Sequence, residues 1–449
     1  MCDNADDGSV SGKRKRIKGP LHEEECTEIG ALPSMDALPV DLGLDWVGEE
    51  ARSLLTSAYT DHCDHCVGAP PLTPDHDKSL KAREATFAGV QAGEGGSNDV
   101  YALGSLLVCR SFCFREEWRK CLRAVDLALI RAGPVVWGKF FRPFEALASS
   151  KLASVEVEGG SGGGKEDRAT GKKAQQKAQQ KAQPAFFGGG RAIPVVEDLT
   201  PEAFKAEHLT KAPVVMRVKD VNLTQDILRK RGAERLVPVE TCNVADKKRS
   251  YLTDSWDREV MSLEQYYEDY VEKDSCEGRS GYLAQWPLLE QISFPVPDVE
   301  EFCIQSGVDD AAPEGCEKEE RSLKSVWVGS NTISPLHHDP YENWIVQCWG
   351  RKYFRLYDFK DSDCVYPMEG KRCNTSSVED PLEPDLKKHG LMEGVEYWEF
   401  VLEEGDALYI PRHWWHYVRG VGGGGSVSFW WGARMAAMKK GGGEWMSIY

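Results

Sequence analysis

The sequence predicts an α+β protein in which a helical N-terminal domain precedes an antiparallel barrel or jelly roll. Apolar residues recur at helical spacing before residue 155, whereas short strand-like runs dominate from about residue 192. Eleven of the fourteen tryptophans lie at or beyond Trp256, which places the densest core in the C-terminal part. Many short strands with few helices between them are typical of barrels and jelly rolls.

The composition is that of a globular protein and excludes a wholly disordered or fibrous one. The chain has 449 residues, of which 41% are hydrophobic and 28% are charged. Its 55 Lys and Arg against 72 Asp and Glu give a formal net charge of −17, so we expect no direct nucleic-acid binding. We also expect no membrane span, no signal or transit peptide, and reduced cysteines.

Residues 1–35 are polar and are expected to form a disordered tail. This tail contains the basic run Lys13-Arg14-Lys15-Arg16-Ile17-Lys18. Such a run is either a nuclear import signal or a solvated basic segment, and both interpretations stay open. Under the first interpretation the protein is located in the nucleus, or in both the nucleus and the cytoplasm.

Residues 36–155 are expected to form a helical domain. An apolar helical pattern runs from Leu103 to Ile130, and Gly133-Pro134 is expected to end it. The segment Asp61-His62-Cys63-Asp64-His65-Cys66 offers zinc-type ligands, but no second pair lies at a fitting distance. We therefore interpret that segment as a surface loop.

Residues 156–191 are expected to be a low-complexity linker, and residues 192–449 the β-rich domain. Glycine runs lie at both ends of the linker, and a Lys-Ala-Gln-Gln repeat lies between them. Six runs after the linker have strand character: 214–216, 344–349, 353–357, 397–402, 407–410 and 427–431. Gly350-Arg351 is predicted to be a hairpin turn between two of these runs.

The stretch Ser334-Pro335-Leu336-His337-His338-Asp339-Pro340 carries a candidate metal site. On a strand, His337 and Asp339 would point to the same face, and His416 on a late strand offers a third donor. Two histidines and one carboxylate are the ligand set of mononuclear non-haem Fe(II) oxygenases. His338 and His413 are alternative ligands, although His338 would point to the opposite strand face.

A keto-acid cosubstrate of such a site would need a cation for its distal carboxylate and small polar donors. Lys352, Asn343 and Ser334 lie close to the metal motif in sequence. A lysine at a strand end is most often exposed, so only its coupling to the motif favours Lys352.

These residues together resemble the JmjC family of 2-oxoglutarate-dependent oxygenases. The resemblance runs from about Ile193 to Trp431 and is closest to the branch that contains an arginyl hydroxylase, also described as a histone lysine demethylase. It rests on these strings: Val237–Glu240, Gly281–Gln285, Thr332–Pro340, Gly350–Tyr353, Trp415–Arg419 and Ser426–Trp431. The resemblance implies a double-stranded β-helix, which is a cupin-like jelly roll. The linker, a polar insertion at 307–321 and the loop Gly422–Gly425 depart from the family pattern without removing a ligand.

The resemblance also implies roles for individual residues. His337, Asp339 and His416 would hold Fe(II) and form the catalytic centre. The residues implied to bind or enclose 2-oxoglutarate are Lys352, Asn343, Tyr282, Ser334 and Trp327. A protein side chain would be recognised by Glu240, Tyr251 and Trp256, although Glu240 could instead be a surface acid at a strand end.

The expected function is that of an Fe(II)- and 2-oxoglutarate-dependent protein oxygenase that uses dioxygen and hydroxylates a side chain, with arginine preferred. Its partner would be a protein or peptide, such as a histone, a ribosomal protein or another chromatin protein. Demethylation of methyl-lysine in histones is the main alternative. An inactive fold that serves as a regulatory binding module is a further alternative, against which the intact ligand set argues.

Overall fold

A computed structural model of the chain describes residues 98–159, 189–219, 221–243, 257–273, 279–295, 299–303 and 322–432. Several predicted features lie outside these residues: the N-terminal tail with its basic run, the segment Asp61–Cys66, the greater part of the linker, and the insertion at 307–321.

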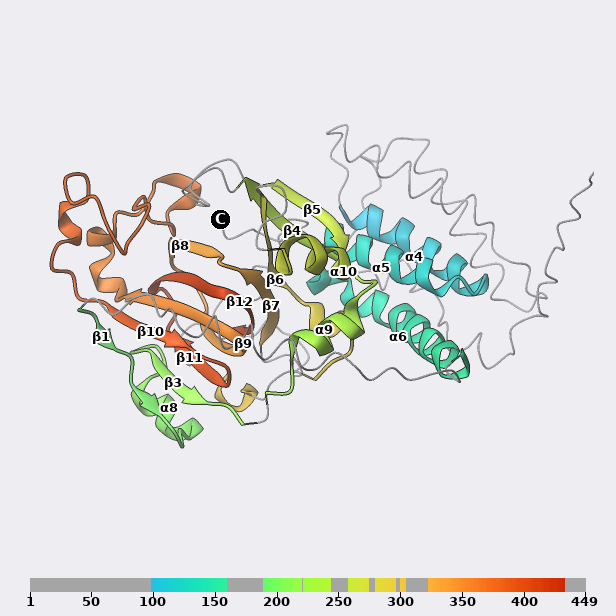
Figure 1. Ribbon diagram of the computed structural model, residues 1–449, viewed down its shortest axis with the longest axis horizontal. Coiled ribbons are helices and arrows are strands. Elements are labelled where there is room, and N and C mark those ends of the chain that lie inside the picture. Colours follow the sequence, from blue (N-terminus) through green and yellow to red (C-terminus); the bar gives the residue numbers. More distant parts are fainter. Residues whose placement is uncertain are drawn as a thin grey trace, which may run out of the picture.

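Three long helices form the N-terminal part of the described chain (Figure 1): α4 (Asn98–Phe114), α5 (Trp118–Ala132) and α6 (Pro134–Gly159). The predicted end of the apolar pattern is confirmed, since α5 ends before Gly133, whose φ is 87°. The pattern is interrupted between α4 and α5, however, where Glu116 has a φ of 56°. This break folds α5 back on α4, so that both helices bury apolar side chains against each other. Helix α6 continues to Gly159, past residue 155, where we expected the helical domain to end.

Twelve strands form one hydrogen-bonded system within the described residues, and most of their pairs are antiparallel. The strands are β1 (Arg191–Ala192), β2 (Val195–Val196), β3 (Val214–Arg217), β4 (Leu236–Asn243), β5 (Asp257–Ser262), β6 (Arg279–Trp286), β7 (Leu323–Ser330), β8 (Ile333–His337), β9 (Glu342–Tyr357), β10 (Trp398–Leu402), β11 (Asp406–Ile410) and β12 (Trp415–Trp431). The predicted fold class, a helical part followed by a cupin-like jelly roll, is confirmed.

Short helices and turns connect these strands. The α-helices are α8 (Pro201–Glu207), α9 (Gln225–Gly232), α10 (Leu263–Tyr266) and α11 (Leu288–Gln291). A π-helical turn spans Tyr267–Val271, and 3-10 turns span Glu300–Phe302, Phe359–Val365, Gly370–Arg372 and Gly390–Met392. Thr200 and Thr224 cap α8 and α9 by accepting a backbone N–H, as their side chains favour.

Two long strands, β9 and β12, pair with each other along most of their length and belong to both sheets of the jelly roll. The first half of β9 pairs with β11 and its second half with β10. In the same way, the first half of β12 pairs with β8 and its second half with β7. The larger sheet therefore runs from β2 to β5, and the smaller one contains β1, β10 and β8 (Figure 1).

The prediction of a hairpin turn at Gly350-Arg351 is wrong. The chain passes through these residues as one continuous strand, β9, which bends where Gly350 has a φ of 71°. The two halves of β9 have the strand character that we predicted, but each half pairs with other strands rather than with its neighbour. A side chain at Gly350 would meet the bent part of β12, since its Cβ would lie 2.3 Å from the carbonyl oxygen of Gly423. The glycine therefore marks the crossing of two bent strands.

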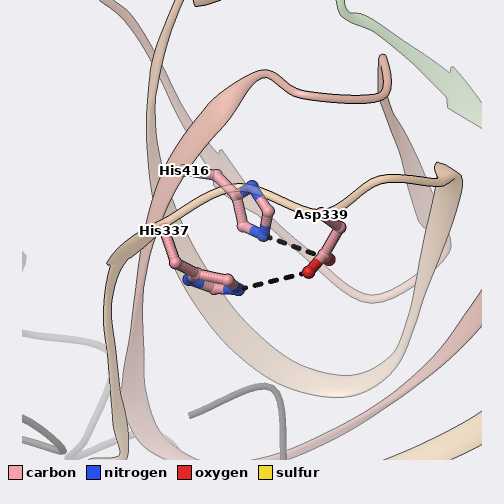
Figure 2. Close-up of side chains that lie close together, drawn as sticks. All are labelled: His337, Asp339 and His416. Atoms are coloured by element: carbon pink, nitrogen blue, oxygen red, sulfur yellow. Dashed lines mark ion pairs between the residues drawn. The ribbon is translucent and has the colours of Figure 1, made fainter. Parts of the chain in front are cut away.

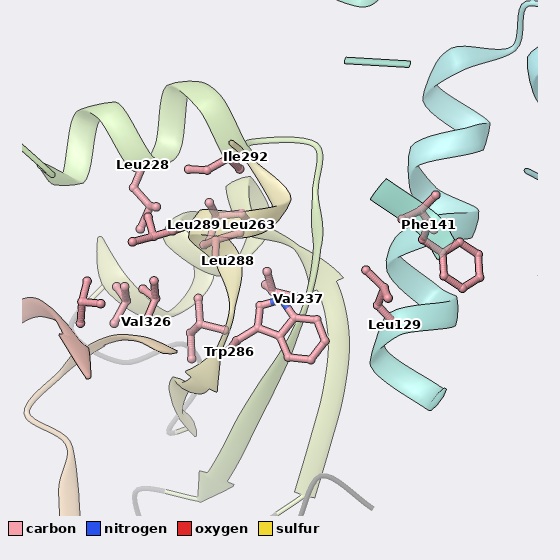
Figure 3. Close-up of a cluster of buried hydrophobic side chains, with 14 of the residues drawn as sticks. Leu129, Phe141, Leu228, Val237, Leu263, Trp286, Leu288, Leu289, Ile292 and Val326 are labelled. Atoms are coloured by element: carbon pink, nitrogen blue, oxygen red, sulfur yellow. The ribbon is translucent and has the colours of Figure 1, made fainter. Parts of the chain in front are cut away.

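The helices and the larger sheet share one hydrophobic core. Leu129 and Phe141 of the helices belong to the same buried cluster as Val237 of β4, Trp286 of β6 and Leu288 of α11 (Figure 3). This continuity means that the helical part is packed onto the β-rich part rather than tethered to it.

A buried polar network crosses the same boundary. Arg235, just before β4, forms ion pairs with Asp126 of α5 and Glu145 of α6 and donates to the carbonyl of Gln291. Asp126 also accepts the backbone N–H of Leu236, the first residue of β4. Burial raises the pKa of Glu145 to about 7, against the opposing effect of the Arg235 charge. One arginine thus satisfies two buried carboxylates and aligns β4 with the helices.

We expect Gly350→Ala to destabilise the fold more than Gly370→Ala. Both glycines have a φ of 71°, so both variants carry the same backbone strain, but a Cβ at Gly370 has no atom within 4 Å. The collision at Gly350 should add roughly 1–3 kcal/mol. Urea unfolding of both variants measures the difference. Equal losses in the free energy of unfolding would show that β9 and β12 can move apart at Gly350 at no energetic cost.

We expect Arg235→Leu to lower the free energy of unfolding by roughly 3–5 kcal/mol, because Asp126 and Glu145 would be left buried without their cation. Arg229→Leu is the matched control. Arg229 also pairs with two acids, Glu264 and Glu272, but these pairs are partly exposed, so its loss should cost about 1 kcal/mol or less. A similar loss in both variants would argue against the interlocking role of Arg235.

Candidate metal and cosubstrate site

Three strands bring the predicted metal ligands together. His337 is the last residue of β8, and its register partner on β12 is His416. His416 in turn lies opposite Leu356 of β9, so the two histidines stand side by side on the inner face of the smaller sheet. Asp339 lies two residues beyond the end of β8. The loop after β8 therefore brings Asp339 close to His337. We had expected the two residues to share one face of a strand, so the structure modifies that expectation.

The ligand atoms of these residues converge (Figure 2). The Nε2 atom of His337 lies 3.9 Å from Oδ1 of Asp339, and that of His416 lies 3.7 Å from Oδ2. The two imidazole centroids are 4.1 Å apart. Among the described residues, this is the one cluster of three such side chains whose ligand atoms all lie within 4.8 Å. All three residues are buried.

Backbone carbonyls orient both imidazoles. Nδ1 of His337 donates to the carbonyl of Pro335 at 2.7 Å, and Nδ1 of His416 donates to the carbonyl of Trp414 at 3.0 Å. With the proton on Nδ1, each Nε2 presents its lone pair to the space beside Asp339. A hydrogen bond from the distal nitrogen is the usual way in which proteins fix a metal-binding histidine.

The electrostatics of the cluster fit a bound cation. Burial, aided by the neighbouring His416, lowers the pKa of His337 well below its ordinary value, so this imidazole is neutral. Burial raises the pKa of Asp339, and its buried Oδ1 has no hydrogen-bond partner. A divalent cation would satisfy that carboxylate and both lone pairs at once, since imidazole and carboxylate are suitable ligands for Fe(II).

The two alternative ligands lie elsewhere. His338 points away from the cluster, as predicted, and packs against Trp415, Phe359 and His413. Burial and the neighbouring His413 lower the pKa of His338 to about 4. These two histidines form an aromatic layer behind the candidate metal site.

A second polar group lies in the same barrel. Lys352 of β9 is buried, donates to Oγ of Ser426 at 2.7 Å and lies over the rings of Tyr282 and Trp327. Burial lowers the pKa of Lys352 to about 7. An anion bound beside this ammonium would stabilise its charged form, so the surroundings fit the distal carboxylate of a dicarboxylic acid.

The remaining predicted cosubstrate residues line this interior. Tyr282, Ser334, Asn343 and Trp327 are all buried, and the hydroxyls of Tyr282 and Ser334 interact. The Oδ1 atom of Asn343 and the Nε1 atom of Trp327 have no hydrogen-bond partner. Unpaired buried polar atoms are costly, and a polar ligand would satisfy them.

Sequence reasoning missed three polar residues of the interior: Thr332, Ser426 and Gln347. Thr332 interacts with the Tyr282 hydroxyl, Ser426 holds Lys352, and Gln347 lies opposite Ser426 in the register of β9 and β12. The alternation in Ser426-Val427-Ser428 could have indicated a polar inner face. The partner of Ser426 depends on strand pairing and had no sequence signal.

Of the three predicted substrate residues, the structure describes Glu240 alone, because Tyr251 and Trp256 lie outside the described residues. Glu240 of β4 lies directly opposite Tyr282 of β6, and residues so paired share one face of a sheet. Its carboxylate is mostly buried and pairs with Arg258 of β5 at 3.5 Å. Glu240 is therefore not an isolated surface acid.

Comparisons with known proteins agree with this arrangement. Residues 172–437 match the family described as "Cupin-like domain". The chain is 35% identical over 209 residues to the "Lysine-specific demethylase JMJ30" of Arabidopsis thaliana, which covers 46% of this chain and 45% of that protein. It is 34% identical over 245 residues to the "Lysine-specific demethylase 8" of Xenopus tropicalis, with 54% and 53% covered.

A longer match joins the chain to the "Lysine-specific demethylase 8" of Danio rerio, at 28% identity over 350 residues, with 74% of this chain and 80% of that protein covered. For the Arabidopsis and Xenopus proteins, by contrast, the chain spans about half their length.

In the described part of the chain, no helix has the length and apolar character needed to cross a membrane.

We expect His337→Gln to weaken Co(II) binding by more than the roughly 10–100-fold typical of losing an outer-shell partner, because it removes a ligand. His338→Gln is the matched control, since the adjacent side chain points to the other face. It should retain the stoichiometry and affinity of the wild-type chain in a Co(II) titration. If the His338 variant loses Co(II) binding and the His337 variant keeps it, His338 and not His337 is the metal ligand.

Proposed function

Because this chain belongs to the JmjC family of cupin-like, 2-oxoglutarate-dependent oxygenases, we propose that it is an Fe(II)- and 2-oxoglutarate-dependent oxygenase that acts on a protein side chain. One observation carries the proposal: the buried cluster of His337, Asp339 and His416 lies in the same barrel as the buried cation of Lys352. The first group suits a metal ion and the second suits the carboxylate of a keto acid.

His337, Asp339 and His416 would hold the iron through the Nε2 atoms of both imidazoles and one carboxylate. Bound Fe(II) supplies the activation of dioxygen, coupled to oxidative decarboxylation of 2-oxoglutarate. The chain keeps both imidazoles in the Nδ1-protonated form through the carbonyls of Pro335 and Trp414. Their orientation is thus ready before a metal binds.

The chain would bind 2-oxoglutarate by charge and by shape. The ammonium of Lys352 would pair with the distal carboxylate, with Tyr282 and Ser334 as hydroxyl partners. Asn343 would contact the cosubstrate near the metal, and Trp327 would form part of the wall. Since these side chains are buried, they would shield the bound cosubstrate from bulk water.

We propose arginine as the modified side chain, recognised by Glu240 together with Tyr251 and Trp256. A guanidinium pairs well with a carboxylate and stacks on a flat aromatic ring. The position of Glu240 beside Tyr282 and its existing pair with Arg258 support this choice, since the carboxylate already accommodates a guanidinium.

Demethylation of methyl-lysine in a histone is the second candidate, and the names of the relatives, lysine-specific demethylases, favour it. Both reactions would use the same site. Hydroxylation of an N-methyl carbon releases formaldehyde, whereas hydroxylation of an arginine carbon leaves a stable alcohol. We propose that the substrate is a chromatin or ribosomal protein and that the enzyme acts in the nucleus, with the basic run Lys13–Lys18 as the import signal.

We expect Lys352→Ala to raise the 2-oxoglutarate concentration that turnover requires. A hydrogen bond to a charged group contributes roughly 1.5–3 kcal/mol, which is about a 10- to 150-fold change in apparent affinity. Arg351→Ala is the control, because the adjacent side chain faces the other side of β9. If the Lys352 variant requires the same 2-oxoglutarate concentration as the wild type, another cation pairs with the distal carboxylate.

The same lysine predicts a pH dependence. In the ligand-free protein the pKa of Lys352 is about 7, so the amine loses its charge above this pH. Binding of the carboxylate needs the ammonium form, and proton uptake should therefore accompany binding above pH 7. The wild-type affinity for 2-oxoglutarate should fall as the pH rises through this range.

We expect the active enzyme to add one oxygen to an arginine of a protein substrate and to release little formaldehyde. Mass spectrometry of nuclear and ribosomal proteins, with and without the active enzyme, would detect this gain. Glu240→Ala should abolish it while sparing uncoupled decay of 2-oxoglutarate. Glu259→Ala is the control, since Glu259 is the register partner of Val239 and lies on the other face. Stoichiometric formaldehyde from a methyl-lysine peptide, without oxidised arginine, would establish demethylation instead.

A further inference from the structure

A tight turn between β11 and β12 lies beside the candidate metal site. The turn spans Pro411–Trp414, and the N–H of Trp414 donates to the carbonyl of Pro411 at 3.1 Å. His413 within it has a φ of 68°, a conformation that costs a non-glycine residue about 1–3 kcal/mol and persists only where the surroundings impose it. The candidate ligand His416 follows the turn two residues later.

This turn contacts two of the three candidate ligands through its backbone. The N–H of His413 donates to the carbonyl of Asp339 at 2.7 Å, and the carbonyl of Trp414 accepts from Nδ1 of His416 at 3.0 Å. A shift of the turn would therefore move Asp339 and rotate the His416 ring together. The spacing of the carboxylate and the imidazole depends on what holds the turn in place.

Glu342, the first residue of β9, is bonded to the turn. Its side chain is 2% exposed, and its Oε2 accepts the N–H of Arg412 at 3.1 Å. The Arg412 guanidinium lies 3.6 Å from Oε1, and the hydroxyl of Tyr409 donates to the same carboxylate. The Tyr409 hydroxyl in turn accepts the N–H of Thr210 at 2.9 Å, which links the group to the segment after α8.

Two consecutive N–H groups of the turn thus bond to the segment 339–342. One bonds to the backbone of Asp339 and the other to the side chain of Glu342. Burial and the Glu342 charge hold the pKa of Tyr409 well above its ordinary value, so the phenol stays a donor to the carboxylate. Loss of the carboxylate would leave a buried phenol and a backbone N–H without their acceptor.

We propose that Glu342 is a positioning residue of the metal site, whose carboxylate fixes the turn Pro411–Trp414 and thereby holds Asp339 and His416 at ligand spacing. The proposal rests on the proposed function in so far as the cluster binds a metal. It requires no contact between Glu342 and the metal, because Glu342 is not among the three residues whose ligand atoms converge.

Three variants of the full chain separate the contributions. Glu342→Ala removes the acceptor and the charge, Glu342→Gln keeps an oxygen for the Arg412 N–H, and Tyr409→Phe removes one donor. Glu399→Gln is the matched control. Glu399 is a similarly buried acid on β10 that accepts from a tyrosine hydroxyl and pairs with an arginine, but these partners, Tyr353 and Arg355, lie on the second half of β9 and not in this turn.

The measurement is a Co(II) titration of the metal-free chain, followed by the visible spectrum of the bound ion, with the melting temperature of each metal-free variant. Glu342→Ala should weaken Co(II) binding about 10- to 100-fold, as is typical of outer-shell partners, and should change the spectrum. Glu342→Gln and Tyr409→Phe should have smaller effects in the same direction. Glu399→Gln should lower the melting temperature while keeping the wild-type affinity and spectrum.

Wild-type Co(II) affinity in Glu342→Ala, or in Glu342→Gln and Tyr409→Phe if the alanine variant does not fold, would overturn the proposal. So would an equal loss of affinity in Glu399→Gln, because the effect would then be one of global stability. A wild-type chain that binds no Co(II) would overturn the metal site and this role with it. Metal binding that depends on Glu342, without turnover of 2-oxoglutarate, would support the positioning role and overturn the proposed function alone.

Discussion

The antiparallel pairing of β9 with β12 is the constraint on which the rest of the structure depends. Each strand bends and contributes one half to each sheet, so the β9–β12 pair joins the two sheets of the jelly roll. The same pairing sets the site, because Asn343 and Lys352 lie on β9 while His416 and Ser426 lie on β12. A one-residue shift of register would turn inner side chains to the outer face of the sheet. The glycines at the crossing therefore serve the site as much as the fold.

The interior of the barrel is polar at a cost to stability. A buried lysine, a buried aspartate and a neutral histidine lie there, although burial disfavours the charged form of the first two. Apolar clusters on both sides of the sheets and on the helices offset this cost. Such an unfavourable local arrangement is expected where binding and catalysis take place, because bound ligands would supply the missing partners.

The helical part contributes to the site from a distance. Arg235 ties α5 and α6 to the start of β4, and Glu240 lies further along that strand beside Tyr282. The strand that carries the candidate substrate residue Glu240 is therefore held in position by contacts with helices outside the barrel. In the same manner, Glu342 and Tyr409 stabilise the turn that approaches the metal ligands from the outer layer of the larger sheet.

The sequence by itself determined the fold class and the two-part order of helices and strands, which follow from hydrophobic periodicity and from β-branched and aromatic runs. A short histidine–aspartate motif with a late histidine indicated the candidate metal site, and the family resemblance favoured His337, Asp339 and His416 over His338 and His413. The sequence predicted the strand character on both sides of Gly350 but not the bend, because a glycine of positive φ serves a hairpin turn and a bent strand equally well. Only the tertiary structure decided which strands pair, and hence that Ser426 meets Lys352 and that Glu342 holds the turn before His416. These contacts join residues 70 or more positions apart, and no local pattern encodes a register between such distant segments.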